Sequence, residues 1–219
     1  MKIVRPSIRI EDKINGQEII KKLEKIGRVC YKSEDNIKEK SAERFIANII
    51  KSGHESVIEH VSLSVRVICS RATSHQWVRH RLASYSQESQ RYCNYSQDKF
   101  DNELIFIEPT FSNKNPELFE GWAIAMQALE NTYLTMIKLG ALPEEARLIL
   151  PNSAKTEFVC TMNLREWRHF FRMRCNKHAQ LEIRLLALQL LDEMYNKIPV
   201  VFNDLYDEYK EEIKNAKIQ

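Results

Sequence analysis

Residues 61–69 read VSLSVRVIC, and this stretch decides the fold class. Apolar side chains at the odd positions alternate with mostly polar ones, a period of two that is typical of a strand with one buried face. Ser70 follows at once and is a suitable N-cap for a helix that runs to about His80. We therefore expect strands and helices in the same fold.

Further strands are predicted on both sides of this stretch. The segment Lys2–Ile10 is expected to form a short edge strand, and Glu103–Ile107 a second strand. Thr156, Phe158, Cys160 and Met162 alternate with their neighbours as in a half-buried strand. The residues from about 81 to 100 are polar and without period, so they predict an irregular segment.

Most of the chain has helical periodicity. The segments with apolar residues at helical spacing are 17–29, 37–52, 116–139, 143–149, 164–174 and 179–197. Pro116 suits a helix start, whereas Gly53 and Gly140 suit helix ends. The charged tail predicts a solvated surface helix. The pattern of strands and helices indicates one α+β domain over residues 1–219.

Glycine is scarce. Five glycines and six prolines make up about 5% of the 219 residues, against roughly 12% in average proteins. No two glycines lie within ten residues of each other. This excludes the GxGxxG dinucleotide fingerprint and the Walker A loop, which both need clustered glycines. A bound nucleotide would have to be held by arginines, hydroxyls or helix N-termini.

Composition also argues against several other classes of protein. The formal net charge is +3, too balanced to demand a nucleic-acid partner. Five scattered cysteines do not indicate a disulfide framework and fit a reducing cytoplasm. The first residues lack an apolar signal core, and no run of 18 apolar residues suggests a membrane span.

Arginines concentrate in two places. Between residues 66 and 91 there are five arginines and two histidines, with Glu88 as the only acid and no lysine. The planar guanidinium of arginine can form two parallel hydrogen bonds to a phosphate or a heterocycle, whereas the ammonium of lysine acts as a point charge. A second basic group occupies residues 165–178. There, four basic residues share one helical face: Arg165, Arg168, His169 and Arg172. Arg147 stands alone beside an apolar run.

The histidines and cysteines do not indicate a metal site. His54 and His60 are six residues apart, and Cys175 and His178 form a single pair without a mate. Zinc sites need more ligands at defined spacings, so we predict no metal. No cysteine lies next to a general base in sequence.

The stretch RHRLASYSQESQRY at residues 79–92 resembles the signature of the flavin-dependent thymidylate synthases: Arg-His-Arg, seven residues, Ser, then Arg two residues later. Order and spacing match elsewhere too. The supporting segments are GHESVIEH at 53–60, ARLILP at 146–151, Asn163-Leu164-Arg165, and Arg174 followed by HAQLEI at 178–183.

The resemblance implies an enzyme that makes dTMP from dUMP. The carbon comes from 5,10-methylenetetrahydrofolate and the hydride from FAD, which NADPH reduces. It also implies an α+β fold with a small mixed sheet packed with several helices and no Rossmann unit. It further implies a homotetramer with shared active sites, and chemistry that does not depend on an attacking cysteine.

The resemblance assigns roles residue by residue. The expected cofactor-binding residues are Ser56, Arg79, His80, Arg81, Gln87, Asn163, Leu164, Arg165 and His169. The expected substrate-binding residues are Gln76, Arg79, Gln87, Glu88, Ser89, Gln90, Arg91, Arg147 and Arg174. Arg174 and His54 are the expected catalytic residues. A cation at the uracil edge favours ionisation at N3, and His54 would lie near the flavin.

Two positions depart from the family pattern. Gln87 stands where members often have Glu, which keeps hydrogen bonding but loses the charge. His169 stands where some members have Asn, and a histidine can titrate near neutrality. Two other classes remain as alternatives: a single-strand nucleic-acid module that uses arginines 66–91, and a structural oligomerising domain.

Overall fold

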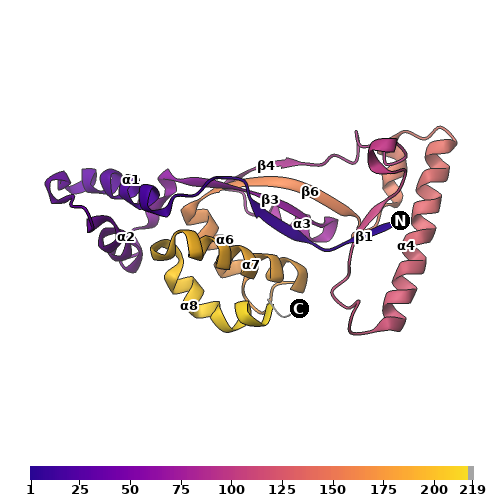
Figure 1. Ribbon diagram of the computed structural model, residues 1–219. Helices are drawn as coiled ribbons and strands as arrows, with labels where there is room; N and C mark the ends of the chain where they lie inside the picture. The colour runs from indigo at the N-terminus through magenta and orange to yellow at the C-terminus, as the bar shows by residue number, and fades with distance from the viewer. Residues whose placement is uncertain (217–219) are drawn as a thin grey trace. The chain divides into compact units, whose positions relative to one another are not determined.

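The computed structural model describes residues 1–216 and combines strands with helices (Figure 1). The strands are β1 (Lys2–Val4), β2 (Ser7–Ile10), β3 (Ser62–Ser70), β4 (Ala83–Gln87), β5 (Ile105–Ile107) and β6 (Lys155–Asn163). The α-helices are α1 (Gly16–Arg28), α2 (Ser41–Lys51), α3 (Arg71–Trp77), α4 (Pro116–Lys138), α5 (Pro143–Ala146), α6 (Leu164–Arg174), α7 (Leu181–Lys197) and α8 (Pro199–Ala216). Short 3₁₀ turns include η3 (Glu55–His60) and η5 (Arg147–Ile149). The predicted α+β class is confirmed.

The strands form two small sheets. One has the order β2-β3-β6-β4, and the other pairs β1 with β5 in parallel, with Lys2 opposite Ile105 and Val4 opposite Ile107. The alternation that predicted β3 and β6 is visible in their burial, because every second side chain of each strand is buried.

The described residues group into two compact units, each assembled from separate stretches of chain. Unit 1 contains Met1–Ser7, Val67–Arg79 and Tyr85–Val159. Unit 2 contains Ile8–Arg66, His80–Ser84 and the described part of 160–219. The prediction of a single domain stays a prediction.

Unit 2 is built around α6 and α7. Helices α7 and α8 lie side by side (Figure 1). Aromatic rings fill the space under α6: Trp167, Phe170 and Phe171 are fully buried, and Phe171 meets Phe202 of α8 edge to face. Burial of these large rings fixes the position of the basic residues on the same helix.

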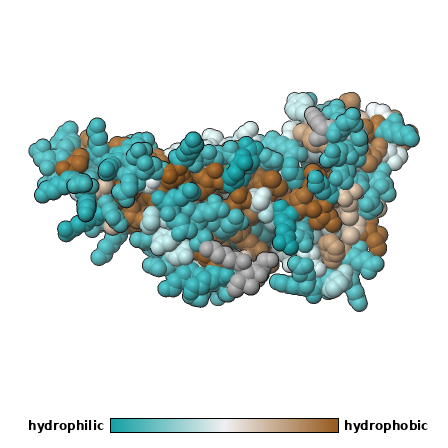
Figure 2. All heavy atoms as spheres, in the orientation of Figure 1, coloured by the Kyte–Doolittle hydropathy of each residue, from teal (hydrophilic) through white to brown (hydrophobic). Residues whose placement is uncertain are grey.

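Unit 1 is built around α4. Buried residues of this helix, Met126 and Tyr133, pack with Tyr95, Leu104 and Phe106. Hydrophobic residues also reach the surface over α4 (Figure 2), where Leu118 and Ile124 are more than half exposed.

Helix ends follow the sequence signals. The side chains of Asn15, Ser70 and Asn115 accept the N-cap hydrogen bonds of α1, α3 and α4. Gly53 (φ +72°) and Gly140 (φ +98°) follow the ends of α2 and α4 in the left-handed conformation that glycine tolerates. Both glycines therefore have a conformational role.

Two predictions about strands were wrong. The single strand over Lys2–Ile10 is two strands, because Pro6 lacks the N–H that a continuous ladder would need. The irregular segment after residue 81 contains β4, whose half-buried positions are Ala83, Tyr85 and Gln87. A strand with so few apolar residues gives a weak signal.

The tail is also more than a solvated helix. It begins at Pro199, directly after α7, and buries one face. The buried residues are Val201, Phe202, Leu205, Tyr209 and Ile213. Among the described residues, no helix is long and apolar enough to cross a membrane.

Candidate active site

The residues that the sequence assigned to the site are divided between the two units. Unit 1 holds Gln76, Arg79, the run 87–91 and Arg147. Unit 2 holds His54, Ser56, His80, Arg81, Asn163, Leu164, Arg165, His169 and Arg174. Most of the expected substrate residues thus belong to unit 1, and most of the expected cofactor residues to unit 2.

The N-terminus of α6 follows β6 without a loop. The Asn163 side-chain oxygen accepts a hydrogen bond from the Glu166 N–H at 2.9 Å, which caps the helix. This leaves the Asn163 amide nitrogen as a donor for a ligand. Leu164 is buried and its N–H donates to the Val61 carbonyl, so its assignment to the cofactor stays a prediction.

The basic face of α6 is not uniformly exposed. Arg165 and Arg172 reach solvent, and each forms an exposed or half-exposed ion pair, with Glu59 and Glu55 respectively. Arg168 is only 1% exposed and bridges Glu55 and Asp204 at 3.0 and 2.6 Å. Arg168 is therefore a structural cation, whereas its neighbours on the helix remain accessible.

In unit 2, His80 contacts three polar side chains of α6: Glu166, His169 and Arg174. Its ring is 5% exposed, and its Nδ1 lies 3.3 Å from Glu166 Oε1. Arg174 donates from Nε to His80 Nε2 at 3.1 Å. Burial, helped by the charges of Arg174 and His169, lowers the pKa of His80 to about 4, so the imidazole is neutral at neutral pH.

The segment around η3 presents two predicted residues to solvent. His54 and Ser56 are exposed, while Glu55 between them turns inward to Arg168 and Arg172. The pKa of Glu55 is lowered: burial opposes the shift, but the hydrogen bond from Arg172 and the two guanidinium charges outweigh it. Glu55 thus ties this segment to α6.

The end of β4 and the turn after it carry the run 87–91, five of the expected substrate residues of unit 1. Gln87 donates from Nε2 to Thr156 Oγ1 at 3.0 Å, which leaves its carbonyl oxygen as an acceptor. The chain then turns at Ser89, whose hydroxyl accepts from the Arg91 N–H. Arg91 pairs with Glu144 at 2.6 Å in an exposed contact.

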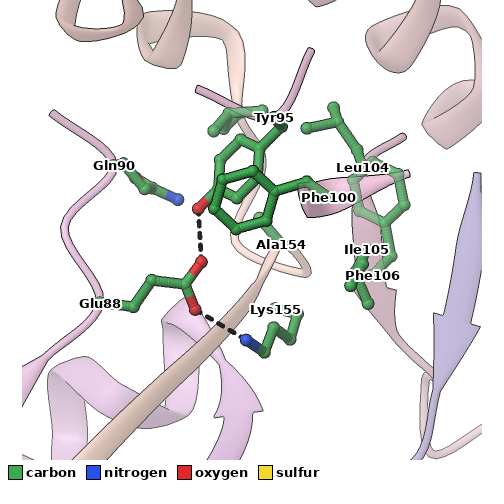
Figure 3. Close-up of a pocket in the computed structure, with 10 residues that line it drawn as sticks. Glu88, Gln90, Tyr95, Phe100, Leu104, Ile105, Phe106, Ala154 and Lys155 are labelled. Carbon is green, nitrogen blue, oxygen red and sulfur yellow. Dashed lines mark hydrogen bonds and ion pairs between the residues drawn. The ribbon is translucent and has the colours of Figure 1, made fainter. Parts of the chain in front are cut away.

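Glu88 and Gln90 line a small cavity in unit 1 (Figure 3). The Glu88 carboxylate accepts from Tyr95 and pairs with Lys155, at 2.8 and 2.7 Å. Burial and the Glu88 charge raise the pKa of Tyr95, so this phenol stays protonated and donates. A volume of about 30 Å³ has room for water but is far below that of a nucleotide pocket.

Several arginines have no partner of their own. The guanidinium groups of Arg79, Arg81 and Arg147 are exposed, and within residues 1–216 none of them makes an ion pair or hydrogen bond. Exposed guanidiniums without an acid are suited to bind the phosphates of a dinucleotide or of a nucleoside monophosphate. The donor set of this chain therefore fits a flavin dinucleotide.

The sequence missed residues whose partners are remote. In the sequence, Glu166 is the one acid among the basic residues of 165–178, yet in the structure it contacts His80, 86 residues earlier. Nothing in the sequence marked Asp204 or Thr156 as a partner of Arg168 or Gln87, because no local feature identifies a partner that lies far along the chain. The spacing of Glu166 and His169, three residues apart on a helix, could have grouped these two.

Comparison with known proteins gives a consistent result. Residues 14–200 match the family described as "Thymidylate synthase complementing protein". A flavin-dependent thymidylate synthase of Geobacter sulfurreducens is 41% identical over 184 residues, which cover 81% of this chain and 78% of the relative. One of Pyrococcus furiosus is 40% identical over 169 residues, which cover 77% and 68%.

A solved structure shares the fold. The UMP/dUMP methylase PolB from Streptomyces cacaoi, bound with 5-Br dUMP, superposes with a TM-score of 0.79 over 95% of this chain and 98% of that one, at 21% identity. An α+β chain with these relatives is an enzyme of the methyltransferase class. It belongs to the flavin-dependent thymidylate synthase family.

Proposed function

We propose that the protein converts dUMP to dTMP, with 5,10-methylenetetrahydrofolate as carbon donor and NADPH as the reductant of bound FAD. The observation that carries this proposal is the ordered set of family motifs, from Gly53 to Ile183, on a chain that belongs to the family. The names of its relatives support the flavin, and the dUMP analogue held by the structural neighbour supports the nucleotide.

The substrate phosphate is assigned to the turn after β4. Ser89 offers a hydroxyl, and Arg147 an exposed guanidinium without an acidic partner among residues 1–216. Arg91 would exchange Glu144 for phosphate; the exposed ion pair between them is worth at most about 1 kcal/mol, so this exchange costs little. Charge-assisted hydrogen bonds to a dianion are stronger than such a pair.

The cofactor is assigned to Arg79, His80 and Arg81 together with residues at the start of α6. Bound FAD would supply the hydride, and the protein would supply orientation and charge. Arg79 and Arg81 would neutralise phosphate, and the Asn163 amide would donate to a polar group of the flavin. Ser56 and Arg165 are exposed and available for the same ligand.

Two residues are assigned to the reaction itself. Arg174 would bind the uracil edge, where its positive charge favours loss of the N3 proton and raises electron density at C5. His54 is exposed, two residues before Ser56, and would take part in proton transfer or in the access of the folate and the nicotinamide to the flavin. Neither role involves a thiol.

We further propose a homotetramer with active sites shared between subunits, in the cytoplasm. The exposed hydrophobic residues over α4 support an assembly surface (Figure 2). All five cysteines are free, which fits a reducing compartment.

The purified protein tests the proposal. We expect it to be yellow or to take up added FAD, and to oxidise NADPH at a rate that responds to dUMP, with dTMP as product when methylenetetrahydrofolate is present. A protein that cannot bind FAD would overturn the proposal. Affinity for single-stranded DNA that falls steeply with salt would instead indicate the nucleic-acid module.

A further inference from the structure

His80 connects the two ends of α6. Glu166 lies in the first turn of this helix and Arg174 is its last residue, and the imidazole contacts both, one through each ring nitrogen. The rings of His169 and Phe170 pack edge to face against His80 from the same helix, with centroids 5.6 and 5.0 Å away. Glu166 is 7% exposed, so the contact between Glu166 and His80 is shielded from water.

The contacts determine where the imidazole proton lies. An arginine Nε–H can only donate, so His80 Nε2 must accept through its lone pair. A neutral imidazole carries one proton, which must therefore be on Nδ1, the nitrogen that faces the Glu166 carboxylate. Glu166 accepts this proton's hydrogen bond and so favours this tautomer over the other.

A metal ion is the competing explanation for the same cluster. Ligand atoms of His80, Glu166 and His169 lie within 4.8 Å of one another. A metal bound at His80 Nδ1 would move the proton to Nε2, where it would oppose the N–H of Arg174. The position of Arg174 thus favours a hydrogen-bonded chain over a metal site.

We propose that Glu166 is a positioning residue for Arg174. By holding the His80 proton on Nδ1, Glu166 keeps Nε2 as an acceptor, and this acceptor orients the guanidinium that meets the nucleotide. The inference rests on the proposed function of Arg174 in dUMP binding. In metal sites, removal of a residue that orients a ligating side chain typically lowers affinity or activity by about 10- to 100-fold, and we expect an effect of that order on dUMP affinity here.

The first experiment needs no nucleotide. Histidine labelled with ¹⁵N reports which ring nitrogen carries the proton in the purified protein. We expect His80 to be neutral with its proton on Nδ1 at pH 7. A proton on Nε2, or a signal for His80 that changes on addition of Zn²⁺, would overturn the proposal whether or not the protein binds dUMP.

The second experiment measures dUMP affinity by calorimetry on FAD-loaded variants compared at equal flavin content. Glu166→Ala should weaken dUMP binding at least tenfold. Glu166→Gln keeps an oxygen that can accept from Nδ1–H and should stay within about threefold of the parent. Glu24→Ala, which removes an equally buried glutamate that pairs with Arg28, is the matched control and should leave dUMP affinity unchanged.

A double-mutant cycle separates positioning from general damage. In His80→Gln the amide oxygen can accept from Arg174 without help from Glu166. Glu166→Ala should therefore cause no further loss in that background. An equal loss in both backgrounds, or dUMP affinity within twofold of the parent in Glu166→Ala, would overturn the proposal. Failure of the parent protein itself to bind dUMP would count against the proposed function instead.

Discussion

Arg172 and Arg174 are two residues apart on α6, yet their surroundings differ. Arg172 is 43% exposed and pairs with Glu55, whereas Arg174 is half-buried and held by His80. An exposed ion pair contributes little to stability, and a guanidinium that is fixed in place contributes mainly to recognition. Two arginines on one helix therefore offer a matched pair for mutation.

Arg174→Ala should remove dTMP formation while FAD stays bound. Loss of one positioned cationic group costs about 10²- to 10³-fold in turnover when it acts on charge that develops in the reaction. Steady-state dTMP formation and the flavin absorbance of the same sample give both quantities. Arg172→Ala is the control, and its turnover should remain within a few-fold. Comparable activity of the two variants would contradict the role of Arg174.

At this scale the sequence predicted which residue types gather but not which of them are accessible. Helical spacing placed Arg165, Arg168 and Arg172 on one face, and α6 confirms the helix. It could not show that Arg168 is buried, because its partners Glu55 and Asp204 lie 113 and 36 residues away. Burial of a charge is decided by such remote partners.

Arg168 joins three elements of unit 2. From α6 it bonds Glu55 of η3, and Asp204 and the Val201 carbonyl of α8. The two carboxylates compensate the charge of the guanidinium, so its desolvation is offset only while both ion pairs are present. The packing of η3 and α8 on α6 therefore depends on one guanidinium.

Arg168→Met should destabilise the protein by about 3 kcal/mol, because it breaks the network in which a buried guanidinium pairs with Glu55 and Asp204 and donates to the Val201 carbonyl. Urea unfolding followed by circular dichroism measures this. Arg172→Ala, which removes a more exposed partner of the same Glu55, should cost less than about 1 kcal/mol. Equal effects of the two substitutions would mean that Arg168 only fills space.

Acid should weaken the same contacts. Hydrogen bonds and charges of the arginines outweigh burial and keep the pKa values of Glu55 and Asp204 below their ordinary values of 4.5 and 3.8. Both carboxyl groups therefore bind fewer protons in the folded chain than in the unfolded one near these pH values. Their contribution to the free energy of unfolding is complete above the ordinary pKa values and is lost as the pH falls through the lower pKa values of the folded chain. Arg168→Met should accordingly flatten the fall in stability below pH about 4.5.

Elements with strong periodicity were predictable and weakly patterned ones were not. The apolar alternation of 61–69 and 156–162 predicted β3 and β6, because burial of one face imposes it. Strand β4 places Gln87 at an inward position, where it bonds Thr156 rather than packing in the core. A strand whose inward positions include polar residues does not show the alternation of apolar and polar residues from which a strand is predicted.

On the scale of the whole molecule, the cysteines differ in their exposure to solvent. Cys30 is exposed and Cys93 half-buried, whereas Cys69, Cys160 and Cys175 are buried. Burial raises the pKa of the Cys175 thiol, which keeps it protonated and unreactive. None of these thiols has a role in the proposed chemistry.

Iodoacetamide should therefore label the native protein at Cys30 and more slowly at Cys93, with dTMP formation retained. Intact-mass spectrometry counts the adducts, and denaturation should expose all five cysteines. Loss of activity in step with labelling would contradict a mechanism independent of thiols. Cys30→Ser separates this outcome from a steric effect of the label, since it should be active and resist inactivation.

Composition also limits how this molecule could bind a nucleotide. Scarce and isolated glycines excluded a glycine-rich phosphate loop, and the exposed guanidiniums of Arg79, Arg81 and Arg147 offer the alternative. Composition could not predict how the site residues divide between two units, because each unit gathers stretches far apart in the chain.

Two strands pass into helices with no residue between them, at Ser70–Arg71 and at Asn163–Leu164. One residue inserted at either junction would rotate the helix by about 100° and turn its functional side chains to another face. Such junctions cannot absorb insertions or deletions, whereas the loops between β4 and α4 can. Length differences among relatives should accordingly collect in residues 92–104 and 108–115, outside the signature residues and strand β5, and the two junctions should keep their spacing.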